Sequence, residues 1–287
     1  MDCHNPFHWV HYFVLFSGIS SDKVRTQVER GYRSFHPDYS KETGKMRRHS
    51  IFTTDKVLKW VRFFRYMKRT QLALLFTGSG KRIKAVEQLL PKLEREGKIT
   101  STWLEGEKVY SPARKKRVQP VSLEHEIEVT EILILLWLCR KVESEIVSER
   151  VFRGFAIVPE GGIRYSEERG TMLVFEYCTR KNFDHGGVMK SKLTRYRKQL
   201  AKIEDKVRRT INVLFVIDID RVAVRKFVTR MQPLLDEPVI SGLTGEERYP
   251  FFFTDYETFK AVPVGEALIS KIYFWHDGKE WRLTNND

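Results

Sequence analysis

The sequence predicts an α+β protein with a small helical domain that ends in a β-hairpin, followed by a larger α/β domain with a mixed sheet. Helical periodicity between residues 50 and 96 gives way to two short strand patterns. In the second half, apolar strand patterns lie on either side of a long basic helix. With 287 residues, 41% of them hydrophobic, the chain is long enough to form two domains with buried cores.

Segment 49–117 has the pattern of three helices. The run Thr53-Thr54-Asp55 offers an N-cap for the first helix, and the second begins near Thr70. The third runs from about residue 81 to residue 96, with Gly97 as its stop.

A proline interrupts this third helix, and a hairpin follows it. Pro91 predicts either a kink or an end to the first part of the helix. Strand patterns at residues 99–104 and 109–110 flank a turn at residues 105–107. Three helices and a hairpin together predict a winged helix-turn-helix.

The positive charge of the chain is concentrated in and just before this domain. Residues 41–117 contain 21 Lys and Arg against 7 Asp and Glu, a balance of +14. Because the whole chain also carries +14, the remaining residues balance at 30 against 30. Such a concentration is typical of a protein that binds a polyanion.

In a winged helix-turn-helix, the N-terminal end of the third helix enters the major groove of double-stranded DNA. Lys81, Arg82 and Lys84 occupy that end. The basic run after the hairpin is expected to contact phosphates without reading sequence; it comprises Arg114, Lys115, Lys116 and Arg117. The alternative is a winged helix that contacts only protein, with these cations as a solvated face.

The domain expected at residues 118–287 begins with a helix near Ser122. Strands are predicted around 155–165, 171–178, 211–217 and 250–254, with an edge hairpin near 272–281. Helices are predicted at residues 188–209 and 222–235. The first of these carries nine Lys and Arg, including Arg195 and Lys198, against two acids. It is either a solvated amphipathic helix or a second nucleic-acid surface.

Two acids accompany the first strands of this domain. Glu160 follows one strand and Glu176 lies near the end of the next. Since adjacent strands are about 4.8 Å apart, a hairpin brings both carboxylates within reach of one metal ion. Mg²⁺ prefers such oxygen ligands and activates water for phosphodiester cleavage. Alternatively, both acids are ordinary solubilising residues at strand ends.

The first 48 residues form an extension to which the sequence assigns no role. Its apolar run at residues 7–16 is shorter than the roughly 20 residues that cross a bilayer, so no membrane partner is expected. Cys3, Cys139 and Cys178 are scattered and odd in number, which predicts no disulfide framework and favours the cytoplasm.

The order of elements, with Pro159-Glu160 at a hairpin and Glu176 on the next strand, resembles the PD-(D/E)xK nuclease-like fold. Joined to a winged helix, it resembles the replication-relaxation family of plasmid and mobile-element proteins over about residues 50–285. Further motifs carrying the resemblance are Gln71-Leu72, residues 90–99 (LPKLEREGKI), Val109-Tyr110, His125, and Lys192-Leu193 with Tyr196.

The resemblance implies that Glu160 and Glu176 hold a metal together with the carbonyl of Tyr177. A lysine is expected two residues after the second acid, but Cys178 stands there. Lys190 or Lys192 would then supply the missing charge. Mg²⁺ is expected only if this site is catalytic.

Three functions remain open. The first is a DNA-binding protein of a plasmid or mobile element that acts in replication or mobilisation, with a degenerate nuclease-like domain. The second is an active Mg²⁺-dependent DNA endonuclease or nickase. The third is a winged-helix transcription regulator whose C-terminal domain binds a protein partner. The expected partners are double-stranded DNA and other replication or mobilisation proteins, and the sequence is compatible with a homodimer.

Overall fold

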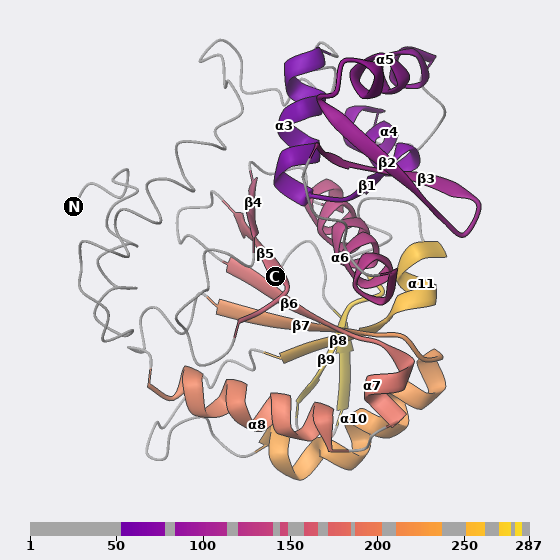
Figure 1. The fold of residues 1–287 in the computed structure, drawn as a ribbon. Helices are drawn as coiled ribbons and strands as arrows, with labels where there is room; N and C mark the ends of the chain where they lie inside the picture. The colour runs from indigo at the N-terminus through magenta and orange to yellow at the C-terminus, as the bar shows by residue number, and fades with distance from the viewer. Residues whose placement is uncertain are drawn as a thin grey trace, which may run out of the picture. The chain divides into compact units, whose positions relative to one another are not determined.

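The computed structural model describes eleven segments: residues 53–77, 84–113, 120–139, 144–148, 158–165, 172–184, 187–202, 211–236, 251–261, 270–276 and 279–282. These residues fall into two compact units (Figure 1). The N-terminal unit lies within residues 45–141, and the C-terminal unit lies within residues 142–287. The features expected in residues 1–48 lie outside the described residues.

The N-terminal unit contains helices and a small antiparallel sheet. Its elements are α3 (Thr54–Phe64), β1 (Met67–Lys68), α4 (Arg69–Thr77), α5 (Lys84–Arg95), β2 (Ile99–Leu104), β3 (Glu107–Pro112) and α6 (Pro120–Cys139). The strand order is β1-β3-β2. Helices and a hairpin lie where the sequence predicts them, although the predicted start of the third helix at residue 81 lies outside the described residues. The two-residue strand β1 is too short to leave a periodic signal.

Local chemistry sets the ends of these elements. The hydroxyl of Thr53 accepts the amide of Lys56 at 3.3 Å, which caps α3 as predicted. The helix α5 continues through Pro91, whose side chain is exposed, and ends at Arg95, two residues before Gly97, where φ is +66°. Of the two outcomes predicted for Pro91, termination of the helix is therefore wrong.

The helix α6 belongs to the N-terminal unit. The side-chain amide of Gln71 on α4 donates to the carbonyl of Ile127 at 2.8 Å, and Leu123 and Ile127 pack against Val109 of β3. Because these contacts bury one side of α6 against α4 and β3, the boundary between the two units falls after residue 141. The sequence analysis placed it after residue 117.

The C-terminal unit is built on a seven-stranded mixed sheet in the order β10-β9-β8-β7-β6-β5-β4. The strands are β4 (Ser144–Ser148), β5 (Gly161–Tyr165), β6 (Met172–Cys178), β7 (Ile211–Ile217), β8 (Phe251–Asp255), β9 (Tyr273–His276) and β10 (Lys279–Arg282). The central strands β6, β7 and β8 are parallel, and the other neighbours are antiparallel. The predicted α+β class with a mixed sheet is confirmed.

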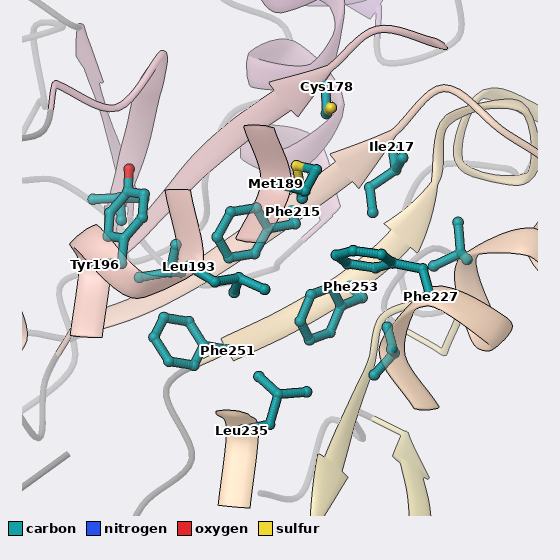
Figure 2. Close-up of a cluster of buried hydrophobic side chains, with 14 of the residues drawn as sticks. Cys178, Met189, Leu193, Tyr196, Phe215, Ile217, Phe227, Leu235, Phe251 and Phe253 are labelled. Atoms are coloured by element: carbon teal, nitrogen blue, oxygen red, sulfur yellow. The ribbon is translucent and has the colours of Figure 1, made fainter. Parts of the chain in front are cut away.

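Two helices cover one face of this sheet. α8 (Val188–Leu200) connects β6 to β7, and α10 (Arg221–Asp236) connects β7 to β8. Figure 2 shows Leu193 of α8 and Phe227 of α10 among side chains of the central strands, including Phe215 and Phe253. The part of the predicted basic helix beyond residue 202 lies outside the described residues.

The opposite face of the sheet carries a short helix, α11 (Tyr256–Ala261). Tyr177 of β6 contacts Tyr256 with ring centroids 5.0 Å apart. Since side chains alternate along a strand, Glu176 and Cys178 face the α8 side. Neither α11 nor α7 (Arg180–Asp184) nor β4 was assigned from the sequence. None of the described helices is long and apolar enough to span a membrane.

We expect Gln71→Leu to destabilise the N-terminal unit by about 2 kcal/mol, because the buried amide of Lys68 loses its acceptor and the carbonyl of Ile127 loses a donor. Urea unfolding of the full chain, followed by circular dichroism, measures this change. Gln88→Leu, on the exposed side of α5, is the matched control and should stay within about 0.5 kcal/mol of the wild type. Equal midpoints for the two variants would contradict this role of Gln71.

Candidate functional site

Glu176 is an acid near the C-terminal end of the buried strand β6, and α8 supplies both of its partners. Its side chain is 3% exposed. The hydroxyl of Tyr196 donates to one carboxylate oxygen at 2.6 Å, and the ammonium of Lys192 forms an ion pair with the other. Lys192 and Tyr196 are four residues apart and therefore lie on the same side of the helix. Both oxygens of Glu176 are occupied.

The electrostatics of this cluster follow from burial. Burial raises the pKa of Glu176, against the lowering effects of the Lys192 charge and the two hydrogen bonds, and Glu160 adds to the rise. The pKa of Tyr196 is raised by burial and by the Glu176 charge, so its phenol stays protonated and donates. In this cluster the Glu176 carboxylate accepts hydrogen bonds from Tyr196 and Lys192.

Glu160 lies immediately beside Glu176. Its amide donates to the carbonyl of Phe175 at 3.1 Å, and the next residue, Gly161, pairs with Phe175 in the sheet. The Glu160 side chain is half-buried. The structure thus brings Glu160, Glu176 and Lys192 together. Lys190 is exposed and lies about 200° around α8 from Lys192, so it does not join them.

Cys178 occupies the position at which the resemblance implies a lysine. Its side chain is 1% exposed, and burial raises the pKa of its thiol to about 11. A neutral buried thiol is neither a cation nor a nucleophile at neutral pH. Of the two aspartates after β7, Asp218 accepts the amide of Arg180 at 3.4 Å and Asp220 caps α10 through the amide of Ala223 at 2.8 Å.

As it stands in this structure, the Glu176 carboxylate has no free oxygen for a Mg²⁺ ion. Mg²⁺ requires near-ideal octahedral oxygen coordination, usually through one or two carboxylates together with waters. Here Lys192 and Tyr196 occupy both carboxylate oxygens of Glu176, and the neighbouring Cys178 offers only a neutral thiol. Within the segments that the structure describes, no group of three or more His, Cys, Asp or Glu side chains is placed to hold a metal. We therefore derive no metal-dependent step.

The second candidate region is the exposed side of α5, which displays Lys84, Gln88, Lys92 and Arg95. Lys84 lies in the first turn of this helix. The other predicted DNA contacts in the N-terminal unit, namely Lys81, Arg82, Arg114, Lys115, Lys116 and Arg117, lie outside the described residues.

Ion pairs hold the acids of the N-terminal unit that lie near α5. Glu87 pairs with Arg69 at 3.2 Å and Glu96 pairs with Lys98 at 2.7 Å. Glu94 accepts from Ser101 and pairs with Lys108 at 3.4 Å, and the hydrogen bond from Ser101 contributes most to its lowered pKa. The Glu94 contacts attach α5 to the hairpin and the Glu87 pair attaches it to α4, and all three acids are neutralised, so that they do not repel a polyanion.

Sequence analysis missed two functional features. From the sequence, Tyr196 was assigned only to the apolar side of its helix and to a motif of the family resemblance. Its position four residues after Lys192 places both side chains on one side of the helix, and this could have indicated a shared partner. The role of Glu94 depends on the hairpin folding back on α5, which no local pattern encodes. Arg195 and Lys198 are both exposed on α8.

The chain matches no protein-family model and has no significant match among curated proteins. Its function therefore has to be inferred from the fold, the charge distribution and the cluster around Glu176.

We expect Lys192→Met to destabilise the C-terminal unit by about 3 kcal/mol at neutral pH, because it leaves the Glu176 carboxylate buried without a cation. The pKa of Glu176, already raised, should rise further. The penalty is absent below the pKa of glutamate in the unfolded chain and grows as the pH rises towards the folded value. Denaturant unfolding between pH 4 and pH 8 measures it.

Two controls accompany this variant. Lys190→Met removes an exposed charge from the same helix and should leave stability nearly unchanged. Glu176→Gln combined with Lys192→Met should recover part of the loss, because no buried charge remains. A Lys192→Met variant with the same pH profile as Lys190→Met would show that the ion pair contributes nothing.

Proposed function

We propose that this chain is a double-stranded-DNA-binding protein of a plasmid or other mobile element, acting in its replication or mobilisation. In this proposal the N-terminal unit is a winged helix-turn-helix that binds the duplex. The C-terminal unit is a degenerate PD-(D/E)xK nuclease-like domain that serves as a second platform. The replication or mobilisation context rests on the family resemblance alone.

The observation that carries the proposal is the location of the charge excess. Residues 41–117 hold a balance of +14. The acids Glu87, Glu94 and Glu96 are each tied to a cation, while Lys84 and Arg95 are exposed on α5. Neutralising phosphate charge releases counterions, and this is the largest sequence-independent contribution to DNA binding.

The arrangement of the N-terminal unit supports the winged helix-turn-helix. Its elements run α3, β1, α4, α5, β2 and β3, and the three strands form one antiparallel sheet. In such a domain α5 would be the recognition helix, and the β2–β3 hairpin would be the wing.

The topology of the C-terminal unit supports the nuclease-like fold. β4, β5 and β6 form an antiparallel meander, and α8 then crosses over to β7, which pairs parallel with β6. The two acids stand just before β5 and within β6. The term degenerate rests on Cys178, which stands where a lysine is expected, and on the Tyr196 hydroxyl, which engages one oxygen of Glu176.

A second candidate is an active DNA nickase, and one contact favours it. The ammonium of Lys192 lies against Glu176, so a cation from α8 occupies the neighbourhood in which the fold would otherwise use a lysine of β6. Because a cation lies near Glu176, although it comes from α8 and not from β6, nicking activity has to be measured directly.

We expect alanine at Lys81, Arg82 and Lys84 together to weaken duplex binding at least tenfold near 0.1 M salt. Each lost phosphate contact lowers the slope of log K against log salt concentration by about 0.9. Each lost base contact weakens the binding free energy by roughly a further 1–3 kcal/mol. Fluorescence anisotropy with a labelled duplex measures both quantities. Alanine at Lys260, Lys271 and Lys279 makes the same charge change in the C-terminal unit. Equal affinities for the two triple variants would refute α5 as the recognition helix.

Incubation with supercoiled plasmid and Mg²⁺ or Mn²⁺ separates the two candidates. If the domain is degenerate, we expect bound protein to shift the electrophoretic mobility of the plasmid without cutting it. We expect the same result for Glu176→Ala. Nicking by the wild type that disappears in Glu176→Ala would make the chain a nuclease. Nicking that persists in the variant points to a contaminating enzyme and calls for further purification, not for a new assignment.

A further inference from the structure

The outer side of the C-terminal helix layer is strongly basic. Nine exposed cations lie on α7, on α8 and the turn that follows it, and on α10: Arg180, Lys181, Lys190, Arg195, Lys198, Lys202, Arg225, Lys226 and Arg230. Over the described residues 180–184, 187–202 and 221–236, the sequence contains only two acids, Asp184 and Asp236. We call these nine side chains the basic helix surface.

Packing holds the two long helices of this surface together. Leu193 of α8 and Phe227 of α10 enter the same core (Figure 2), and the guanidinium of Arg197 donates to the carbonyl of Leu234. Figure 1 shows α8 and α10 in one layer below the sheet. Their apolar sides face the strands, so their cations face solvent.

Few of these cations are neutralised within the unit. Arg225 pairs with Glu280 at 2.9 Å. Within the described segments, Lys190, Arg195, Lys198, Lys226 and Arg230 have no acidic partner within ion-pair distance. Keeping unneutralised like charges together opposes folding through repulsion, so a bound polyanion would stabilise this surface.

The chemistry of the surface favours duplex DNA over a membrane. A helix that binds a lipid surface buries large apolar side chains into it. On these helices the exposed large apolar side chain is Val222 alone, among the residues that the structure describes. An exposed hydroxyl side chain of the kind that contacts phosphate, Ser191, accompanies the cations instead.

Single-stranded nucleic acid is also a poor match. Proteins that bind it stack bases on exposed aromatic rings. The aromatic side chains of α8 and α10, Tyr196 and Phe227, are buried in the core. The cations on α8 and its following turn run from Lys190 to Lys202, which spans about 18 Å of helix, roughly half a turn of duplex.

We propose that the basic helix surface binds the phosphate backbone of a second double-stranded DNA segment, without reading its sequence. This inference rests on the proposed function, in which the C-terminal unit is a second platform, and specifies what that platform binds; the surface uses none of the residues of α5. A chain with two duplex-binding surfaces holds two DNA segments together.

The test compares two charge-matched variants of the full chain. Lys198→Glu with Lys226→Glu changes one residue on each helix of the surface. Lys260→Glu with Lys279→Glu changes two exposed lysines on α11 and β10. Each pair lowers the net charge by 4, from +14 to +10. An immobilised duplex of arbitrary sequence, about 30 base pairs long, is loaded with protein and challenged with a second, labelled duplex.

We expect the wild type and the Lys260/Lys279 variant to capture the second duplex, and the Lys198/Lys226 variant to lose at least nine-tenths of that capture. Equal capture by the two variants, or no capture by the wild type, overturns the proposal. Circular dichroism and thermal unfolding establish that both variants are folded.

A second arm separates this proposal from the proposed function. In the background of alanine at Lys81, Arg82 and Lys84, duplex binding that remains belongs to the basic helix surface. There, Lys198→Glu with Lys226→Glu should lower the salt dependence of log K by about 2, on the basis of two lost phosphate contacts. An unchanged salt dependence overturns the second surface, whereas an unweakened triple-alanine parent contradicts only the recognition helix. Preferential binding to phosphatidylserine vesicles over duplex would assign the surface to a membrane and overturn the proposal.

Discussion

The C-terminal unit depends on the burial of its central strands on both faces. Every residue of β6, β7 and β8 is buried. Strands of this kind need helices across the sheet, and right-handed crossover connections place α8 and α10 there. A buried acid within such a strand then requires internal partners, since an unpaired buried charge costs several kcal/mol. Lys192 and Tyr196 meet that requirement, so the local chemistry around Glu176 is a consequence of how the sheet is covered.

Both units join elements through ion pairs, but only the C-terminal unit also carries the basic helix surface. In the N-terminal unit, Glu87 and Glu94 hold neighbouring elements together through Arg69 and Lys108, and their neutralisation leaves a positive field around α5. In the C-terminal unit the apolar core fixes the helices, and the exposed cations are left for solvent or a partner. Basic side chains therefore connect elements in the N-terminal unit, whereas many of those in the C-terminal unit remain exposed to solvent.

Much of the fold was predictable because its signals are local. The continuous apolar runs of β6 and β7, the cap at Thr53 and the stop at Gly97 each depend on neighbouring residues alone. β1 is too short to show a period, and the attachment of α6 depends on Gln71, 56 residues before its partner Ile127. At the candidate site, the proximity of Glu160 and Glu176 follows from strand pairing. The choice of Lys192 over Lys190 depends on the rotation of α8, which the sequence leaves undetermined.

The rate at which Cys178 is chemically modified can measure local opening of the C-terminal sheet. Its thiol is buried, with a pKa of about 11, so at pH 8 only about one thiol in a thousand is ionised even before access is considered. Reagents that attack thiolates therefore modify this residue through excursions that separate β6 from α8. The rate at which the peptide containing Cys178 gains mass reports the free energy of those excursions. Cys178, which weakens the resemblance to a nuclease, thus serves as a natural probe of the free energy that holds α8 on the sheet.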